Sequence, residues 1–285
     1  MLNVWARVML GCEHTELTAG YFIDYCRRGG GLMQMRSDGK HGGQYLRFKT
    51  GSQSVARGIH ALLPADNVRL STPVTSIEDQ GTSVVVTSTI GETFKARKVI
   101  VSLPTPLYKD IQFSPPLPST KAHVTSSTFL GTYTKVIVCY DQPWWQHMGF
   151  SGLTLAFEGP VAVARDTSVE ANRQFSLTCF VNGEPGRQWS KLPQHERRSQ
   201  VLAQLASMYE NHDAVYKPIE IFEQEWQNEE FSKGAVCPIF SDKDLLGQRE
   251  AYISSVGNLH FVGTEFATEW KGENKSKFQV LGVLV

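Results

Sequence analysis

The chain has 285 residues, which is long enough to bury one large hydrophobic core or two smaller ones. Its 28 basic and 28 acidic residues balance, so the net charge does not indicate binding to nucleic acid or to an anionic membrane surface. A hydrophobic fraction of 41% is typical of a globular protein, and no run of about 18 apolar residues predicts a membrane span. The amino-terminal residues lack the layout of a signal peptide, so we expect a soluble intracellular protein of the cytoplasm or a peroxisome.

The cysteines show neither a C-x-x-C pair nor the spacing of zinc ligands. There are five of them, at Cys12, Cys26, Cys139, Cys179 and Cys237. Several stand inside apolar runs, which is typical of buried thiols. We therefore expect free cysteines in a reducing compartment and no metal site.

The first ~30 residues favour helices, and Thr15 is the expected cap of a second helix that ends at Arg27-Arg28. A short strand is predicted over residues 46–50, followed by Gly51 and a helix. This strand–glycine–helix unit fits a phosphate site and an ordinary turn equally well.

The remaining pattern alternates mostly between strands and turns. Strands are predicted over residues 69–77, 83–89, 93–103, 132–140, 153–157, 161–165, 175–181 and 218–226. Residues 98–103 are almost wholly apolar, so we expect a strand buried on both faces. One clear helix is predicted after Pro193. The mixture lacks strict βα alternation, which favours an α/β (α+β) fold over a single doubly wound sheet.

The most informative segment is 259–272, where an apolar strand ends at Gly263 and is followed by Thr264 and Glu265. The glycine lets the backbone approach a ligand closely, and the next two side chains offer a hydroxyl and a carboxylate. The alternative interpretation is a pair of residues that caps a helix.

As a string, this segment resembles the Gly-Thr-Glu-Thr-Ala-x-x-Trp-x-Gly signature of flavin-dependent amine oxidases, and of the monoamine oxidases in particular. Four further stretches are similar to that family and follow in its order: 42–54, 70–74, 113–118 and 130–138. The match stops after Gly272.

The resemblance implies a two-domain flavin amine oxidase-like fold, with an incomplete FAD-binding domain and a mixed-sheet substrate domain. Residues 1–48 and 125–228 are assigned to the substrate domain. Residues 49–124 and 229–285 are assigned to the FAD-binding domain, with 273–285 as an atypical tail.

The chain contains no G-x-G-x-x-G, the motif with which the family admits the FAD pyrophosphate to a helix N-terminus. Residue 1 corresponds to a point inside the family's substrate domain. We therefore expect an N-terminally truncated fragment, and we expect that the isolated chain does not hold FAD with useful affinity.

Lys135 is the first candidate catalytic residue. Strand alternation places it on one face with Ile137 and Cys139, where loss of water would lower the pKa of its amine. A lysine at an edge strand that reaches solvent is the alternative. The resemblance makes Lys135 the flavin-facing lysine that holds a water at flavin N5. It also places Trp226 beside the isoalloxazine, with plain core packing as the alternative.

The resemblance also implies binding residues. Val74 would meet adenine through its backbone, and Thr264, Glu265 and Trp270 belong to the flavin-binding signature. The substrate cavity would contain Gln44 as a polar group and Phe180 as an aromatic wall.

Ala235 stands where animal monoamine oxidases carry the cysteine bonded to flavin, so we expect FAD to be held non-covalently. The two positions of the family's aromatic cage are occupied by Val236 and Glu273, which are not aromatic.

The function implied is FAD-dependent oxidation of primary or secondary amines to imines or aldehydes by O2, with H2O2 as product. The partners would be a small amine and O2, and a homodimer is compatible with the family. Two alternatives remain open. One is an inactive amine oxidase fragment. The other is a polyamine or L-amino-acid oxidase, which should show an acidic entrance or an arginine that binds a carboxylate.

Overall fold

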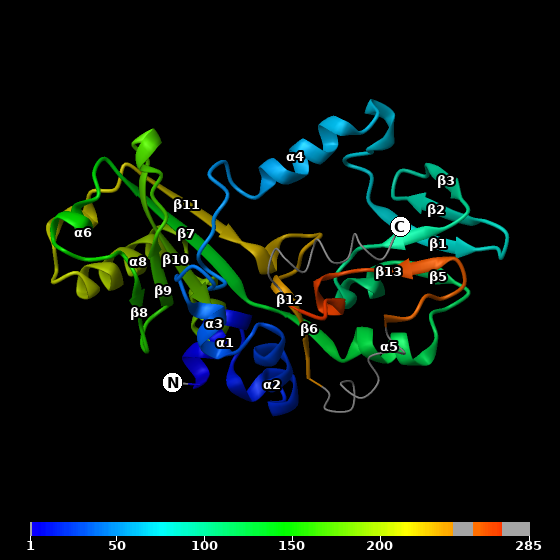
Figure 1. Ribbon diagram of the computed structural model, residues 1–285, viewed down its shortest axis with the longest axis horizontal. Coiled ribbons are helices and arrows are strands. Elements are labelled where there is room, and N and C mark those ends of the chain that lie inside the picture. Colours follow the sequence, from blue (N-terminus) through cyan, green and yellow to red (C-terminus); the bar gives the residue numbers. More distant parts are fainter. Residues whose placement is uncertain (1, 242–252, 270–285) are drawn as a thin grey trace. The chain divides into compact units, whose positions relative to one another are not determined.

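The computed structural model describes residues 2–241 and 253–269. It divides into two compact units, each built from two chain segments (Figure 1). The first contains Met1–Leu17 and Phe129–Ile239, and the second contains Thr18–Thr128 and Phe240–Val285. These boundaries differ from the expected ones: residues 18–48 and 125–128 group with the second unit, and residues 229–239 group with the first.

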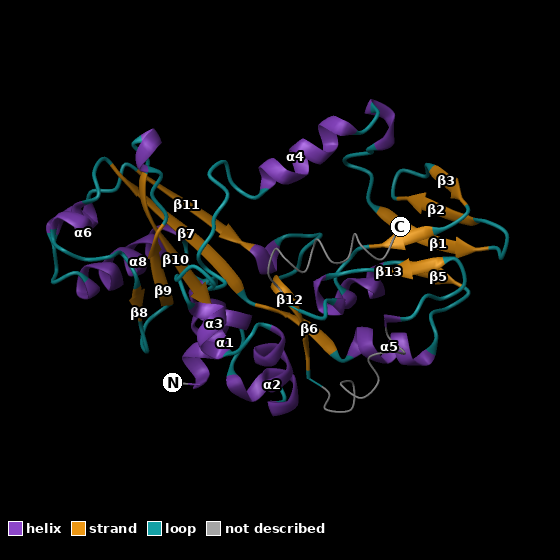
Figure 2. Ribbon diagram, in the orientation of Figure 1, coloured by secondary structure: helices purple, strands orange, loops and turns teal. Residues whose placement is uncertain are grey.

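The first unit is built on a five-stranded antiparallel sheet with the order β11-β7-β10-β9-β8 (Figure 2). The strands are β7 (Tyr133–Tyr140), β8 (Thr154–Leu155), β9 (Val161–Asp166), β10 (Phe175–Asn182) and β11 (Glu220–Glu225). Along β7 the even-numbered residues are fully buried and the odd-numbered ones from Lys135 onward are half-buried. One face therefore supports the core, and the predicted strands of this unit are confirmed.

The core of the first unit lies between this sheet and α8 (Gln194–Met208). Val201 and Leu205 of α8 are fully buried at helical spacing, and Pro193 stands at the N-cap, as the sequence predicts. Trp145 and Trp189 are among the largest fully buried side chains. Aromatic side chains bury large apolar areas, so they supply much of this core.

The other elements of the first unit are short. They are α1 (Leu2–Leu10), η1 (His14–Glu16), β6 (Thr128–Gly131), α6 (Trp144–His147), η4 (Glu170–Asn172), α7 (Gly183–Trp189), η5 (Asp213–Tyr216), η6 (Trp226–Asn228) and β12 (Ala235–Phe240). Strands β6 and β12 pair with each other.

The second unit contains a four-stranded sheet with the order β3-β2-β1-β5 and a separate parallel pair, β4 with β13. Its strands are β1 (Val74–Asp79), β2 (Val84–Ser88), β3 (Thr93–Ala96), β4 (Val99–Val101), β5 (Gln112–Ser114) and β13 (Leu259–Phe261). Its helices are α2 (Ala19–Arg28), α3 (Leu32–Arg36), α4 (Gln53–Leu62), η2 (Ala65–Asn67), η3 (Thr105–Asp110), α5 (Ser119–Ser126) and η8 (Thr264–Phe266). A core cluster that includes Ile77, Val101 and Phe261 joins the two sheets.

Three local predictions in the second unit are wrong. Residues 46–50 form no strand, and Leu46 is 83% exposed, so no partner strand covers it. Thr18, rather than Thr15, caps α2, because its hydroxyl accepts the backbone N–H of Tyr21 at 3.2 Å. The strand predicted over 93–103 is divided into β3 and β4.

The expected burial of residues 98–103 on both faces is also wrong, since Ile100 is 47% exposed. The strand predicted from residue 69 begins only at Val74. Ser71 has a φ of 53°, and Pro73 has no N–H with which to pair.

All five cysteines are free thiols. Within residues 2–241 and 253–269, no helix combines the length and the apolar character needed to cross a bilayer. In the same ranges no cluster of three or more His, Cys, Asp or Glu side chains could hold a metal ion.

Candidate functional site

The face of the five-stranded sheet that carries Lys135, opposite the core, is the first part of the candidate site; we call it the Lys135 face. Residues directly opposite each other on paired antiparallel strands share a face, so the register gives two rows across the sheet. One row is Gln224, Lys135, Phe180, Val163 and Leu155. The next row is Phe222, Ile137, Thr178 and Arg165.

Lys135 lies on β7, with β10 on one side and β11 on the other. Its Nζ is 5.6 Å from the centroid of the Phe180 ring, in the row described above. Burial lowers the pKa of the Lys135 amine, because a charged ammonium loses water in this position. The side chain is thus a half-buried donor on the face that alternation predicts, and the pairing of β7 with β10 places it beside an aromatic ring.

Trp226 follows directly after β11, two residues beyond Gln224, which is opposite Lys135. Its side chain is 39% exposed, so it is not a core residue. Its backbone carbonyl accepts the N–H of Gly234 at 2.9 Å, which closes the loop that leads to Ala235, the first residue of β12. Trp226 and Gly234, the residue before Ala235, therefore lie at the two ends of one closed loop.

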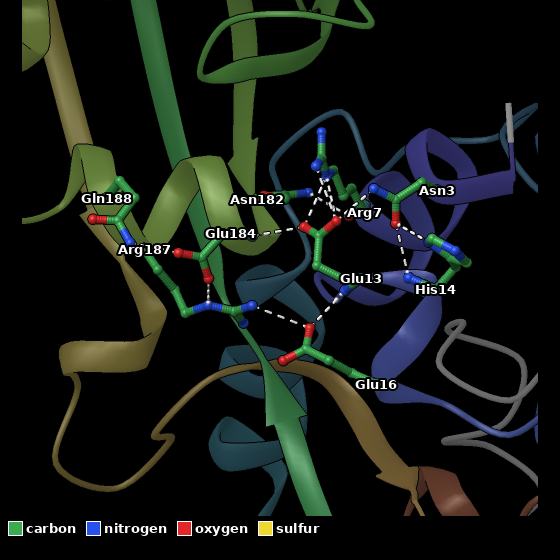
Figure 3. A network of polar contacts seen from close by, with 9 residues as sticks. All are labelled: Asn3, Arg7, Glu13, His14, Glu16, Asn182, Glu184, Arg187 and Gln188. Atoms are coloured by element: carbon green, nitrogen blue, oxygen red, sulfur yellow. Dashed lines mark hydrogen bonds and ion pairs between the residues drawn. The ribbon is translucent and has the colours of Figure 1, made fainter.

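A polar network around Glu13 fixes the end of β10, the strand that carries Phe180 (Figure 3). The Glu13 carboxylate accepts from Arg7 Nε at 2.8 Å and from the backbone N–H of Glu184, the second residue of α7, at 2.8 Å. Asn182, the last residue of β10, donates its side-chain amide to the Arg7 carbonyl at 3.1 Å. These hydrogen bonds connect the start of α7 and the end of β10 to α1 and the residues that follow it.

Two features strengthen this network. Arg187 bridges Glu184 at 2.7 Å and Glu16 at 3.1 Å, and the backbone N–H of Glu13 donates to Glu16 at 2.6 Å. Burial acts to raise the pKa of Glu13, but the hydrogen bonds from Arg7, Glu184 and Asn3 outweigh it, and the pKa falls to about 2. Glu13 is therefore charged throughout the physiological range.

In the second unit, Glu265 is 2% exposed and joins two loops. Its Oε1 accepts both the backbone N–H of Thr105 at 2.9 Å and the Thr105 hydroxyl at 2.6 Å. Thr105 follows β4 and Glu265 follows β13, and these two strands are parallel. The carboxylate thus caps η3, so the capping interpretation describes Glu265, although the helix concerned is distant in sequence.

The same edge has features that fit a flavin nucleotide. Ligands of α/β proteins bind outside the carboxyl ends of parallel strands, where Gly263, Thr264 and Glu265 lie. A Cβ at Gly263 would stand 2.3 Å from Glu265 Oε2, so the Glu265 carboxylate fills the space that a side chain would need. Val74 packs against the core cluster that contains Leu259 and Phe261, the ends of β13. Gly263, Thr264 and Glu265 could hold a nucleotide cofactor at this edge.

The two residues expected in the substrate cavity belong to different units. Gln44 lies in the second unit and donates its side-chain amide to the Met35 carbonyl at 3.3 Å, whereas Phe180 lies in the first unit. Trp270 and Glu273 lie outside the described residues.

Three residues of the candidate site could not be singled out from the sequence. Arg165 lies on the Lys135 face, Thr105 holds Glu265, and Glu13 anchors β10. Arg165 follows Val163 by two residues, so alternation places the two on one face, but only the sheet order brings that face to Lys135. Thr105 and Glu13 leave no comparable signal, because the contact of Thr105 with Glu265 and that of Glu13 with Glu184 span 160 and 171 residues.

Comparison with known proteins agrees with this architecture. The model of the family described as flavin containing amine oxidoreductase matches residues 2–272. The chain is 31% identical over 273 residues to the flavin-containing amine oxidase B of Cavia porcellus, and 29% identical over 274 residues to that of Sus scrofa. Each alignment covers 95% of this chain and 52% of the relative, so the chain spans about half the length of these curated relatives.

Solved structures show the same fold. A double mutant of putrescine oxidase is similar with a TM-score of 0.89, and cyclohexylamine oxidase from Brevibacterium oxydans with 0.88. Both are 24% identical in sequence, and each comparison covers 98% of this chain and 61% of the other. The match of the family model across nearly the whole chain shows that this protein belongs to the flavin-containing amine oxidoreductases.

Proposed function

We propose that the protein oxidises primary or secondary amines to imines, which hydrolyse to aldehydes, with FAD as cofactor and O2 as electron acceptor. The observation that carries the proposal is Lys135, a half-buried lysine of lowered pKa beside Phe180, in a chain that belongs to this family. When bound, FAD supplies the redox chemistry, taking two electrons and two protons from the amine and passing them to O2 to give H2O2.

Residues of the chain would bind the amine and the cofactor. Phe180 and Ile137 present apolar surface to the carbon skeleton of an amine. The half-buried amine of Lys135, whose pKa is lowered by burial, would serve as a donor that holds a water molecule. Thr264 and Glu265, braced by Thr105, would hold the cofactor, and Val74 would contact it through its backbone.

An amine oxidase-like protein without activity is the second candidate. A titration of the purified protein with FAD, followed by anaerobic addition of phenethylamine, separates the two candidates. Saturable FAD binding and loss of the oxidised flavin absorbance support amine oxidation. Failure of the amine to reduce bound flavin contradicts it, and failure to bind FAD favours the inactive protein.

A further inference from the structure

Glu225, the last residue of β11, is bonded through both of its carboxylate oxygens and directly precedes Trp226. Arg197 Nη1 lies 3.0 Å from Glu225 Oε1. The Ser190 hydroxyl donates to Oε2, and so does the side-chain amide of Asn228, at 3.1 Å. The Glu225 side chain is only 14% exposed, so water competes little for these charge-assisted contacts. The carboxylate is therefore fixed in one orientation.

Alternation along the strand then directs Trp226 to the opposite side of the sheet. Glu225 has an extended backbone, with φ −98° and ψ 92°, and successive side chains of an extended chain point to opposite faces. Glu225 is opposite Thr134, which is fully buried on the core side, whereas Gln224 is opposite Lys135. Trp226 therefore shares the side of Gln224, which is that of the Lys135 face.

The residue after Trp226 is also attached to β7. The side-chain amide of Gln227 donates to the Thr134 hydroxyl at 3.0 Å. Thr134 is fully buried and directly precedes Lys135. The two sequence neighbours of Trp226 are thus both held, one through Arg197 and one through the strand that carries Lys135. The backbone from which the indole extends is fixed on both sides.

The side chains that hold Glu225 belong to the corner between α7 and α8. Trp189, the last residue of α7, donates its indole N–H to the Arg197 carbonyl at 3.1 Å, and its ring centroid is 5.2 Å from the guanidinium carbon. Ser190 follows directly. The start of α7 meets the Glu13 network, which fixes the end of β10. Helix α7 thus supports β10 at one end and β11 at the other, the two strands that flank Lys135.

We infer that Glu225 is a positioning residue, which sets the orientation of Trp226 on the Lys135 face. This rests on the proposed amine oxidation, with Trp226 at its expected place beside the isoalloxazine. A flat aromatic ring beside a cofactor must keep its place and tilt closely to be useful, so its support has to be rigid. Loss of the Glu225 carboxylate frees the end of β11 from the corner between α7 and α8.

Glu223 is the matched control, because it shares almost every property of Glu225 except proximity to Trp226. It lies on the same strand and the same side, two residues earlier, and Arg197 holds it at 3.0 Å as well. Its side chain is 5% exposed, and Arg198 contacts it at 2.7 Å. A purely structural role of these carboxylates would thus make the loss of Glu223 at least as damaging as the loss of Glu225.

Fluorine NMR of protein that carries ring-fluorinated tryptophan tests the inference without FAD or amine. The Trp226 signal is the one that Trp226→Phe removes. Glu225→Ala should shift or broaden this signal, Glu225→Gln should restore most of it because an amide oxygen still accepts hydrogen bonds, and Glu223→Ala should leave it unchanged. Ser190→Ala, which removes a single hydroxyl, should cause a smaller change in the same direction, and it serves if Glu225→Ala does not fold.

An unchanged Trp226 signal in the Glu225 and Ser190 variants overturns the inference, and so does an equal change in Glu223→Ala. With FAD-loaded protein, we also expect Glu225→Ala to slow flavin reduction by phenethylamine by about 10-fold to 100-fold, and Glu223→Ala to stay close to wild type. A displaced Trp226 with an unchanged rate would likewise overturn it. A wild-type protein that does not reduce its flavin refutes the proposed function instead, while the fluorine spectra still decide the role of Glu225.

Discussion

Glu13 shows how one side chain can set the geometry of a distant strand. It joins α1 to the start of α7, and α7 follows directly after β10, which carries Phe180. Its carboxylate has a pKa of about 2 against an ordinary value of 4.5. Because the folded-state pKa is lower, the charged form stabilises the fold above pH 4.5, and that stability is lost as the pH falls through about 2.

Glu13→Gln should therefore lower the free energy of unfolding at pH 7 by about 2 kcal/mol. The side chain keeps its shape but loses the charge that Arg7 meets. Denaturant unfolding between pH 2 and pH 7 measures this, and the difference between wild type and variant should shrink as the pH falls. The control is Glu196→Gln, since the Glu196 side chain is 51% exposed and should change little. A difference independent of pH would argue against the charge as its cause.

Lys121 gives a pH dependence of the same sign in the second unit, but in an alkaline window. It is 2% exposed, its Nζ is 4.1 Å from the centroid of Phe261, and burial lowers its pKa from 10.5 to about 8. The unfolded chain binds more protons than the folded one between these values, so stability rises with pH in that window. Lys121→Met should remove this rise. Unfolding measured at pH 7.5, 9 and 10.5 on both proteins checks it, and parallel curves would contradict it.

At the scale of elements, alternation of apolar and polar residues was a good guide in the first unit. It predicted β7 and β10, and it placed Lys135 with Ile137 and Cys139, the half-buried residues of β7. It was wrong at residues 46–50, where apolar side chains are exposed rather than paired. The local residue pattern reflects the propensity of a segment to be extended, but a β-strand also needs a neighbouring strand with which to form hydrogen bonds.

The sheet order explains why the Lys135 face could only partly be predicted. Strand β10 lies between β7 and β9, and β11 pairs with the far side of β7. Neighbours in the sheet are thus often not neighbours in sequence, and register depends on contacts across the fold. Arg165 could be assigned to a face of its own strand from the sequence, but its row beside Lys135 could not.

The turn at Gly263 provides a test at this scale. Gly263→Ala would place a methyl group 2.3 Å from Glu265 Oε2 and push the carboxylate away from Thr105. We expect a loss of about 2 kcal/mol in unfolding free energy, from displacement of a buried, hydrogen-bonded carboxylate. Gly58→Ala is the matched control, because Gly58 lies in α4, where an added methyl group would meet no other atom within 4 Å, and it should gain up to about 1 kcal/mol. Equal effects of the two changes would refute the steric argument.

At the scale of the whole molecule, the two units each combine an early and a late chain segment. The candidate flavin-binding segment lies in the second unit, while Ala235 and Lys135 lie in the first. We expect bound FAD to be non-covalent, because the methyl side chain of Ala235 cannot form a thioether. Acid precipitation of FAD-loaded protein should release all the flavin into the supernatant. Flavin fluorescence that remains with the precipitated chain would contradict this expectation.

The central claim is that amine oxidation takes place at the Lys135 face. Lys135→Met removes the donor and nearly preserves the volume and apolar packing of the side chain. With FAD-loaded protein, stopped-flow absorbance follows flavin reduction by phenethylamine without oxygen, and then reoxidation by O2. Loss of one preorganised donor at a reacting centre costs on the order of 10²-fold in rate, so we expect such a decrease in one or both half-reactions, with the amine's dissociation constant little changed. Wild-type rates in both half-reactions would contradict the claim.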